Sequence, residues 1–598
     1  MTRMNNAIKS ILASLLCVMA ASCGELTFGD KFLGEAPESS GATLETMFSS
    51  QTNAEQVLTR AYTGLMYGLP EPSDNRMGIN ILESITDLSY ATTSNVSDGP
   101  KQLYYNGALS PMNIPGYAAY VFGSETDWTT IRYAWTYIEN VDRVPDMTAE
   151  QKELKKAEAK VLIALSYFNM MRYVGGFPYI DHAVSVDETL YFPRRTFAES
   201  VDIIKTLLDE AIPALTWKWD DANDGRMSSA AAMALKFKLL HWAASPTFNS
   251  DTKWNAAADE YTCYGNYDRQ RWVDAQNAGR EFFDAVAANG GYGLIQPAAA
   301  THQARREAFR QAYYRRGGTE VLISVRKGTD AATVNSSLFE ARALERVCPT
   351  LNYVNMFPWE DGSDFPADFD WSAVDWTNPH KAPFFTVDEK GAMTHTRDPR
   401  LYESVAVPGD TYFNGNPAPV FTVKANESVK GTGFWMMKFI LHEASERAYF
   451  VHWPHTRLTE IMLGYAEVLN EVNDGPTAAA YDMINQVRAR VGLSALGTMN
   501  KEQFTEAVLR ERALELGFEE VRWFDLVRRN RVDDFRKKLY GLISMALDDQ
   551  YNPTTFAFST FELTDRYWVS NWNSKWYLAP IPQNEINKNY GMTQNPGW

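Results

Sequence analysis

The chain has 598 residues, enough to bury a large core in one very large domain or in several ordinary ones. Its 74 acidic residues exceed its 57 lysines and arginines, and the net charge of −17 disfavours nucleic-acid binding and, more weakly, strongly anionic ligands. Four cysteines are too few for a disulfide scaffold, and no stretch is long and apolar enough for a transmembrane helix.

The N-terminus has the pattern of a bacterial lipoprotein signal. Arg3 and Lys9 precede a short apolar run, residues 11–19, and small residues then lead directly to Cys23. A basic start, an apolar core and a small-residue cleavage site are typical of exported proteins, and a cysteine at the cleavage site is typical of lipidation. The alternative is an ordinary secretory signal, because Ala20 stands where lipoprotein signals more often have leucine. We expect an exported protein whose acylated cysteine, carrying palmitate, holds it on a membrane.

The pattern divides the first 250 residues into three parts. Residues 1–22 are the expected signal peptide, and 23–52 are expected to be a lipid-anchored tether because they show no hydrophobic period. Helical patterns follow, several with recognisable capping boxes. The expected helices begin at Asn53 and stop at Gly68, begin near Ile131 and stop at Pro145, run from Thr148 to Gly175, begin at Thr196, and run from Ala231 to Ala244.

Between residues 251 and 454 glycine, proline, asparagine, aspartate and aromatic residues interrupt every pattern. Only 271–287 is predicted to be helical there, and 320–325 to be a strand. Loops of this length in a folded protein usually carry function. Helices return at 456–472, 476–490, 500–516 and 519–529, and residues 531–598 form a C-terminal extension.

Helix pairs at both ends of the chain therefore flank an irregular block. Their small inward-facing residues favour tetratricopeptide-like hairpins, although the strict 34-residue period is absent. We predict a mainly α fold: divergent tetratricopeptide-like helix pairs form a superhelical scaffold at about 53–250 and 455–530. A large irregular, loop-rich block carrying few short strands would fill 251–454, with 53–598 forming a single domain.

Two pairs of residues could be interpreted as a catalytic site and a zinc site, but a structural role explains each pair better. Glu511 and Glu515 lie one helical turn apart and could be an acid/base pair, but the arginines between residues 510 and 529 make ion pairing along the helix a sufficient explanation. His452 and His455 are the nearest approach to a zinc motif, without the cysteine or glutamate partners that such a motif needs. We predict no catalytic residue, no metal site and no cofactor.

Segments along most of the mature chain resemble the SusD/RagB family in the expected order. They are Gly225-Arg226, Ala244 to Asn249, Cys348 with Phe357 to Gly362, Arg397 to Leu401, Arg457-Leu458, Tyr465 to Glu471, Ile484 to Arg490, Arg510 to Leu516, Arg522 to Leu526, Pro580 to Pro582 and Gln594 to Trp598. The resemblance implies a surface-exposed outer-membrane lipoprotein that binds a nutrient, usually a glycan. It also implies a partner, a SusC-like TonB-dependent transporter, on which the protein sits as a lid.

Two aromatic, polar loops are the candidate ligand site. The first, between Asp87 and Trp128, joins two scaffold helices and commonly borders the ligand in this family. The second lies between Phe357 and Trp376, where tryptophan rings could stack on sugars and carboxylates could accept hydroxyl hydrogen bonds. The alternatives are local packing, a solvated acidic loop or, for the aspartates, calcium binding. The candidate residues are Asp87, Tyr104, Tyr105, Tyr117, Trp128, Trp359, Asp361, Asp364, Trp371, Trp376, Arg397 and Trp435, and Arg397 has a structural turn as its alternative.

We therefore expect a non-catalytic surface protein that captures a glycan by ring stacking and hydrogen bonding and delivers it to the transporter. A binding protein for other cargo such as peptides is the main alternative. A surface glycan-degrading enzyme is the second, although no convincing acid/base pair stands in the loop block.

Overall fold

The computed structural model describes residues 43–66, 68, 80–91, 101–114, 125–185, 187–326, 347–412, 418, 431–440, 452–547, 554–564 and 566–598. Helices predominate in these residues, and each sheet found among them consists of two antiparallel strands. The structure thus confirms the mainly α prediction. Cys23 and Tyr117 lie outside the described residues, and no described helix is long and apolar enough to cross a bilayer.

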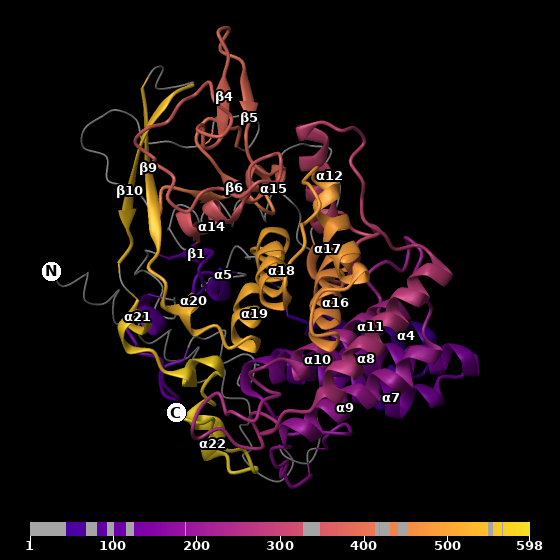
Figure 1. The fold of residues 1–598 in the computed structure, drawn as a ribbon. Coiled ribbons are helices and arrows are strands. Elements are labelled where there is room, and N and C mark those ends of the chain that lie inside the picture. The colour runs from indigo at the N-terminus through magenta and orange to yellow at the C-terminus, as the bar shows by residue number, and fades with distance from the viewer. Residues whose placement is uncertain are drawn as a thin grey trace, which may run out of the picture.

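The N-terminal half contributes a continuous stack of helices (Figure 1). α4 packs on α7, α7 on α8, and the series continues through α9 and α10 to α11. Short elements, including π-helical η2 (Lys101–Tyr105), connect or precede these helices. The bounds are α3 Leu44–Met47, α4 Gln51–Thr63, α5 Asn80–Glu83, α7 Glu125–Asn140, η3 Val141–Arg143, α8 Ala149–Val174, α9 Phe197–Ala211, η4 Ile212–Ala214, α10 Ser229–Ala244 and α11 Arg269–Asn289.

The later helices complete this scaffold, because α16 packs on both α10 and α11 and carries α17 and α18 on its other sides. α16 approaches α11 closely at Gly279, where a side chain would not fit, because a Cβ on Gly279 would lie 2.4 Å from the ring of Tyr465 in α16. The bounds are α16 Leu458–Val472, α17 Ala478–Arg490, α18 Lys501–Leu516, α19 Arg522–Arg528, α20 Val532–Arg536, α21 Tyr567–Asn571, η7 Ser574–Tyr577 and α22 Gln583–Asn587.

Short helices and strands, among them β4, β5, β6, α14 and α15, form the upper part of the molecule in Figure 1, whereas β1 lies near its middle. The strand pairs are β1 (Ser89–Tyr90) with β3 (Cys348–Pro349), β2 (Val321–Arg326) with β8 (His452–Arg457), β4 (Phe385–Val387) with β5 (Met393–His395), β6 (Val405–Ala406) with β7 (Trp435–Met436), and β9 (Tyr540–Ala546) with β10 (Phe556–Glu562). The helices there are α12 (His302–Tyr314), α14 (Leu351–Met356) and α15 (Pro399–Ser404).

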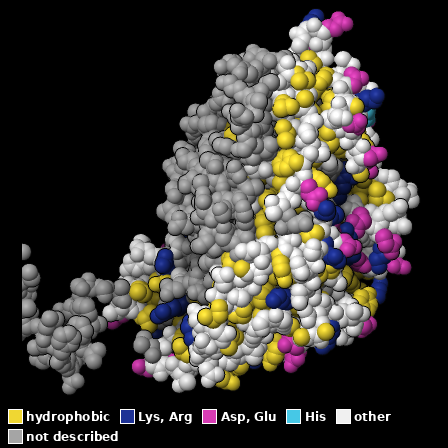
Figure 2. All heavy atoms as spheres, turned by 90° about the vertical axis from the view of Figure 1, so that its left-hand side faces the viewer, with side chains coloured by type: hydrophobic (Ala, Val, Ile, Leu, Met, Phe, Trp, Pro, Cys, Tyr) yellow, Lys and Arg dark blue, Asp and Glu magenta, His cyan; other side chains and the backbone are white. Residues whose placement is uncertain are grey.

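The β9–β10 hairpin runs along one side of the molecule. It exposes Tyr540, Met545 and, just beyond its first strand, Leu547. Figure 2 shows this side, where hydrophobic side chains line the upper part of the described surface.

Three predicted capping boxes are present, at Thr148, Thr196 and Asn500, each with its glutamine or glutamate partner three residues on. The expected cap at Asn53 is wrong: the Ser50 hydroxyl accepts from the Asn53 amide, so α4 begins earlier. Helical structure already starts at Leu44, inside the segment expected to be tether. α12 was not foreseen, because few of its residues are apolar and its arginines obscure the pattern.

A network of buried arginines and carboxylates joins the irregular block to the scaffold. Glu515 of α18 contacts Arg490 of α17 at 2.5 Å, Arg457 of β8 at 3.0 Å and Arg400 of α15 at 3.3 Å, and all four side chains are fully buried. Burial alone would raise the pKa of Glu515, but the three guanidinium groups hold it well below its ordinary value. The expectation of ion pairing along the helix is corrected, because the arginine partners of Glu515 come from other elements.

We predict that Glu515→Gln lowers the free energy of unfolding by about 3–5 kcal/mol, because it leaves buried guanidinium groups without their counter-charge. Urea denaturation measures this loss. Glu506→Gln is the matched control on the same helix: Glu506 pairs with Arg531 at the surface, where such pairs contribute less than about 1 kcal/mol. Equal losses in the two variants would contradict the assigned role of the network.

Candidate functional site

Two of the candidate site residues lie in the interior and bind the protein itself. Both oxygens of Asp87 accept hydrogen bonds from Arg522, at 2.9 and 2.8 Å. Arg397 is fully buried and donates to the carbonyl oxygens of Val354 at 2.8 Å and Phe357 at 2.6 Å. Burial lowers the pKa of Arg397 to about 9. The structure thus gives Arg397 the turn-holding contacts that were the alternative to ligand binding.

Tyr104 and Tyr105 are also buried. The Tyr105 hydroxyl donates to the carbonyl of Ser84 and accepts from the amide of Ala91 at 3.1 Å, and burial raises its pKa strongly. The Tyr104 ring meets Trp568 edge-on, with 6.0 Å between centroids. Both rings therefore fasten the first loop to its neighbours.

The tryptophans of the second loop belong to a packed aromatic cluster. Trp359 is 3% exposed and Trp371 is 8% exposed, whereas Trp376 is half-buried. Their ring neighbours come from the same loop, from the start of β4 and the residue before it, and from β10, and are Phe365, Phe369, His380, Phe384, Phe385, Phe556 and Phe558. Neither Trp359 nor Trp371 presents an open ring face in this arrangement, which corresponds to the local-packing alternative.

The aspartates of this loop mostly organise its turns. Asp361 accepts from the amide of Ser363 at 2.9 Å and from its hydroxyl at 2.6 Å, and these bonds lower the pKa of Asp361. Asp370 makes the same contacts to the residue two positions on, as expected for Asx turns. Asp364 is exposed and pairs with Arg510 of α18. No described group of histidine, cysteine, aspartate and glutamate side chains is placed to hold a metal ion.

Trp435 is half-buried in β7 and lies against Tyr412, with ring centroids 5.8 Å apart. Cys263 and Cys348 are both buried, and neither takes part in a disulfide.

Trp128 is different, because it lines a surface hollow of about 470 Å³. One wall comes from α7 and the other from the loop that follows α8. The lining residues are Trp128, Ile131, Arg132, Ile180, His182, Val184, Ser185, Glu188 and Leu190. A hollow of this size, mostly apolar with a few polar groups, has the character of a small-molecule site. We refer to it as the Trp128 hollow.

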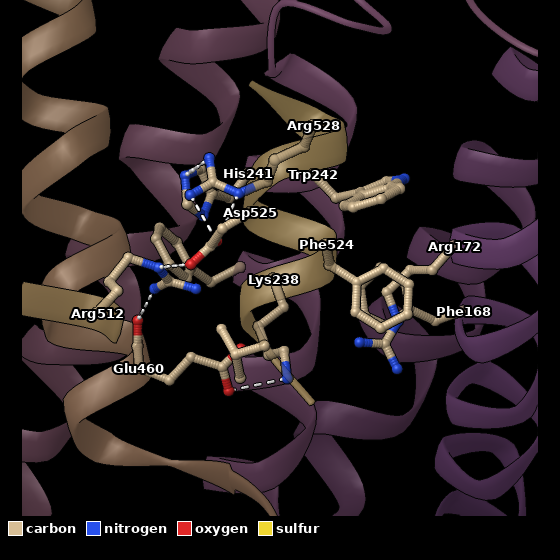
Figure 3. A pocket seen from close by; sticks show the side chains of 12 residues that line it. Phe168, Arg172, Lys238, His241, Trp242, Glu460, Arg512, Phe524, Asp525 and Arg528 are labelled. Atoms are coloured by element: carbon tan, nitrogen blue, oxygen red, sulfur yellow. Dashed lines mark hydrogen bonds and ion pairs between the residues drawn. The ribbon is translucent and has the colours of Figure 1, made fainter. Parts of the chain in front are cut away.

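Two further cavities in the described part of the chain are much smaller, about 40 Å³ each, with room for water but not for a sugar. One of them is interior and is shown in Figure 3. Most of its charges are paired: Lys238 contacts Glu460 at 2.9 Å, and Asp525 accepts from Arg512 of α18 at 2.7 Å and from Arg528 of its own helix, α19, at 2.9 Å. This pairing indicates a structural role.

The loop wall of the Trp128 hollow is fixed by His182. Its Nδ1 lies 2.8 Å from Asp181 and its Nε2 lies 2.8 Å from Glu188, and these two hydrogen bonds raise the pKa of His182. Glu188 also accepts from the amide of Ser185 at 3.3 Å. Trp135 of α7 adds a bond from its indole nitrogen to the carbonyl of Ile180, at 2.9 Å. The His182 and Glu188 bonds thus hold the loop to itself, and the Trp135 bond ties it to α7.

Sequence reasoning found Trp128 but missed Arg132, His182 and Glu188. Arg132 follows Trp128 by four positions on α7, and that spacing places both on one helix face. Nothing in the loop's own pattern marks His182 and Glu188, because their contact depends on how the loop folds back.

Asp127, next to Trp128 on α7, is fully buried, and neither of its carboxyl oxygens has a hydrogen-bond partner in the described structure. Burial raises its pKa to about 8, with Ser166 and Arg172 opposing the shift. The carboxyl group is therefore neutral up to about pH 8 in the folded protein.

Comparison with known proteins supports the fold. Residues 323–598 match the sequence model of the SusD family. SusD-like protein P38 of Formosa agariphila is 23% identical over 419 residues, which span 67% of this chain and 71% of that protein. The structure of a SusD-like protein from Bacteroides fragilis superposes with a TM-score of 0.69 at 20% identity, covering 94% of this chain and all of that one. A second structure from that species, named a SusD-like carbohydrate binding protein, gives 0.65 at 19% identity over 91% and 99% of the two chains.

The buried carboxyl group of Asp127 should make the free energy of unfolding depend on pH. Because its pKa is raised on folding, the unfolded chain loses this proton first, and stability falls as pH rises from about 4 to about 8. An asparagine amide mimics the neutral acid, so Asp127→Asn should gain stability relative to the wild type across that interval and keep the gain at pH 9. Urea denaturation at pH 5, 7 and 9 measures the difference, with Asp202→Asn at an exposed position of α9 as control. A difference that stays constant with pH would contradict the assignment.

Proposed function

We propose that this chain belongs to the SusD/RagB family, that it binds a glycan at the cell surface and that it passes the glycan to a SusC-like TonB-dependent transporter. In this proposal the lipid on Cys23 anchors the protein in the outer membrane. The transporter and the membrane position are implied by the family resemblance. Carbohydrate binding is supported further by the name of the similar Bacteroides fragilis protein.

The Trp128 hollow is the observation that carries the ligand proposal. Its indole lines the hollow and is half-buried. Tyr167 supports it edge-on at 6.4 Å between ring centroids. Stacking of an apolar sugar face on such a ring contributes on the order of 1 kcal/mol. The affinity of one site is then modest, and a high local concentration above a transporter makes modest affinity sufficient.

Binding is favoured over cleavage at this site. Glycoside hydrolysis usually needs two carboxyl groups on either side of the scissile bond. Among the described lining residues Glu188 is the only carboxylate, and it is already bonded to His182 and Ser185. We therefore propose capture without chemistry. Peptide cargo remains the alternative, since the hollow's apolar lining would also accept apolar side chains.

We predict that Trp128→Ala weakens oligosaccharide binding about fivefold to tenfold, the loss expected for one stacked ring. Isothermal titration of the soluble chain from residue 43 onward against panels of oligosaccharides and of peptides measures this. Trp217→Ala is the matched control, because Trp217 is half-buried on a different part of the surface, against Tyr292. Unchanged affinity in Trp128→Ala would contradict the site, and binding of peptides alone would contradict the glycan proposal.

The anchor is tested separately. Cys23→Ala should abolish lipidation and remove the protein from the cell surface, as measured by surface labelling and membrane fractionation. Cys17→Ala, within the apolar run of the signal, is the matched control and should leave localisation unchanged. Retention of Cys23→Ala on the surface would overturn the proposed anchor.

A further inference from the structure

Aliphatic side chains line both walls of the Trp128 hollow. Ile131 belongs to α7, and Ile180, Val184 and Leu190 belong to the loop that follows α8. Ile180 and Val184 are half-buried and Leu190 is 60% exposed, so a ligand in the hollow would remove further apolar surface from water. The loop wall therefore offers a ligand an aliphatic contact surface that is separate from the indole of Trp128.

Several polar groups of the loop wall form hydrogen bonds within the protein. Both ring nitrogens of His182 are bonded to carboxylates of the same loop, one of which is Glu188. The backbone N–H of Ile180 donates to the Tyr167 hydroxyl at 2.9 Å, and the carbonyl of Ile180 accepts from the indole of Trp135 at 2.9 Å. Much of the hydrogen-bonding capacity of this wall is thus used by the protein itself.

This lining favours some sugar substituents over others. The other polar side chains that line the hollow, Arg132 and Ser185, are exposed and therefore hydrated. A sugar hydroxyl that meets the aliphatic surface loses water without gaining a hydrogen-bond partner, which costs free energy. A methyl or acetyl group has the opposite preference, because each apolar carbon buried there is equivalent to about fourfold in affinity.

We infer that the Trp128 hollow selects glycans whose sugars carry a small, uncharged apolar substituent, which binds against Ile180, Val184 and Leu190. This rests on the proposed glycan-binding function and narrows its ligand class. The substituent is an O-acetyl group, an O-methyl group or the methyl group of a 6-deoxy sugar, and all three present the same chemistry to this surface. The volume of about 470 Å³ is in the range of small-molecule sites and accommodates the substituent together with its sugar ring.

The test uses pairs of oligosaccharides that differ in the substituent alone, compared by isothermal titration. Acetylated xylo-oligosaccharides are paired with their deacetylated forms, and O-methylated galacto-oligosaccharides with the unmethylated chains. Oligosaccharides ending in L-fucose are paired with those ending in L-galactose, where a hydroxymethyl group replaces the methyl group. We expect the substituted member of at least one pair to bind about fivefold more tightly and with a more negative heat-capacity change, because it buries more apolar surface. The three kinds of pair distinguish the three sources of the substituent.

Two variants place polar atoms on the proposed contact surface. Val184→Thr replaces a methyl group by a hydroxyl group at nearly constant shape, and Leu190→Asn replaces an isobutyl group by an amide. Each should lower the affinity ratio between the substituted and unsubstituted members from about fivefold to about twofold. The matched controls are Val273→Thr, at a half-buried position of α11, and Leu547→Asn, at a position that is 62% exposed, and both should keep the wild-type ratio.

Two results would overturn the inference and leave the proposed function standing. One is equal affinity for the two members of every pair that binds, and the other is a preference for the substituted member that neither Val184→Thr nor Leu190→Asn reduces. If no oligosaccharide of any pair binds, the proposed function fails and the inference fails with it. Thermal unfolding of each variant establishes that the comparison is made on folded protein.

Discussion

The fold depends on the ion-pair network around Glu515. Three arginines reach this carboxylate from α15, β8 and α17, so a single buried charge connects the irregular block to two parts of the helical scaffold. Burying these charges is costly and is offset only while every partner is present. Glu320 extends the network through Arg490, and Glu519 extends it through Arg457 and Lys438. The network therefore fixes how the block docks on the scaffold. Any other placement of the block would leave some of these charged groups unpaired.

The Trp128 hollow lies on a separate part of the scaffold and uses a different principle. Its rigid wall is α7, which packs on both α4 and α8, and its second wall is a loop fastened by hydrogen bonds from His182 and Trp135. A binding surface assembled this way combines a fixed aromatic ring with polar groups on a loop. The ring position is set by helix packing, while the loop sequence is free to change what the hollow recognises.

The sequence predicted the features that depend on residues close together along the chain. It did not predict those that depend on contacts between distant segments. The capping boxes at Thr148, Thr196 and Asn500 are local, and all three are present. The pairing of Glu515 was not predictable, because charges one helical turn apart look the same whether they face solvent or distant arginines. Trp359 and Trp371 look like stacking platforms in the sequence, and only the packing of β4 and β10 against their loop shows that they are buried. Trp128 carries no stronger signal than they do, and its exposure follows from the position of α7.

The β2–β8 pair influences which part of the chain can vary in length during evolution. Arg326 pairs with His452, so the segment that lies between them leaves and re-enters the scaffold at neighbouring points. The entropy of closing a loop grows only logarithmically with its length. Insertions or deletions in that segment therefore alter little of the free energy that holds its two ends, provided they spare the charges that dock on Glu515. The strand pair therefore allows the segment between Arg326 and His452 to change in length and composition while the helical scaffold stays the same.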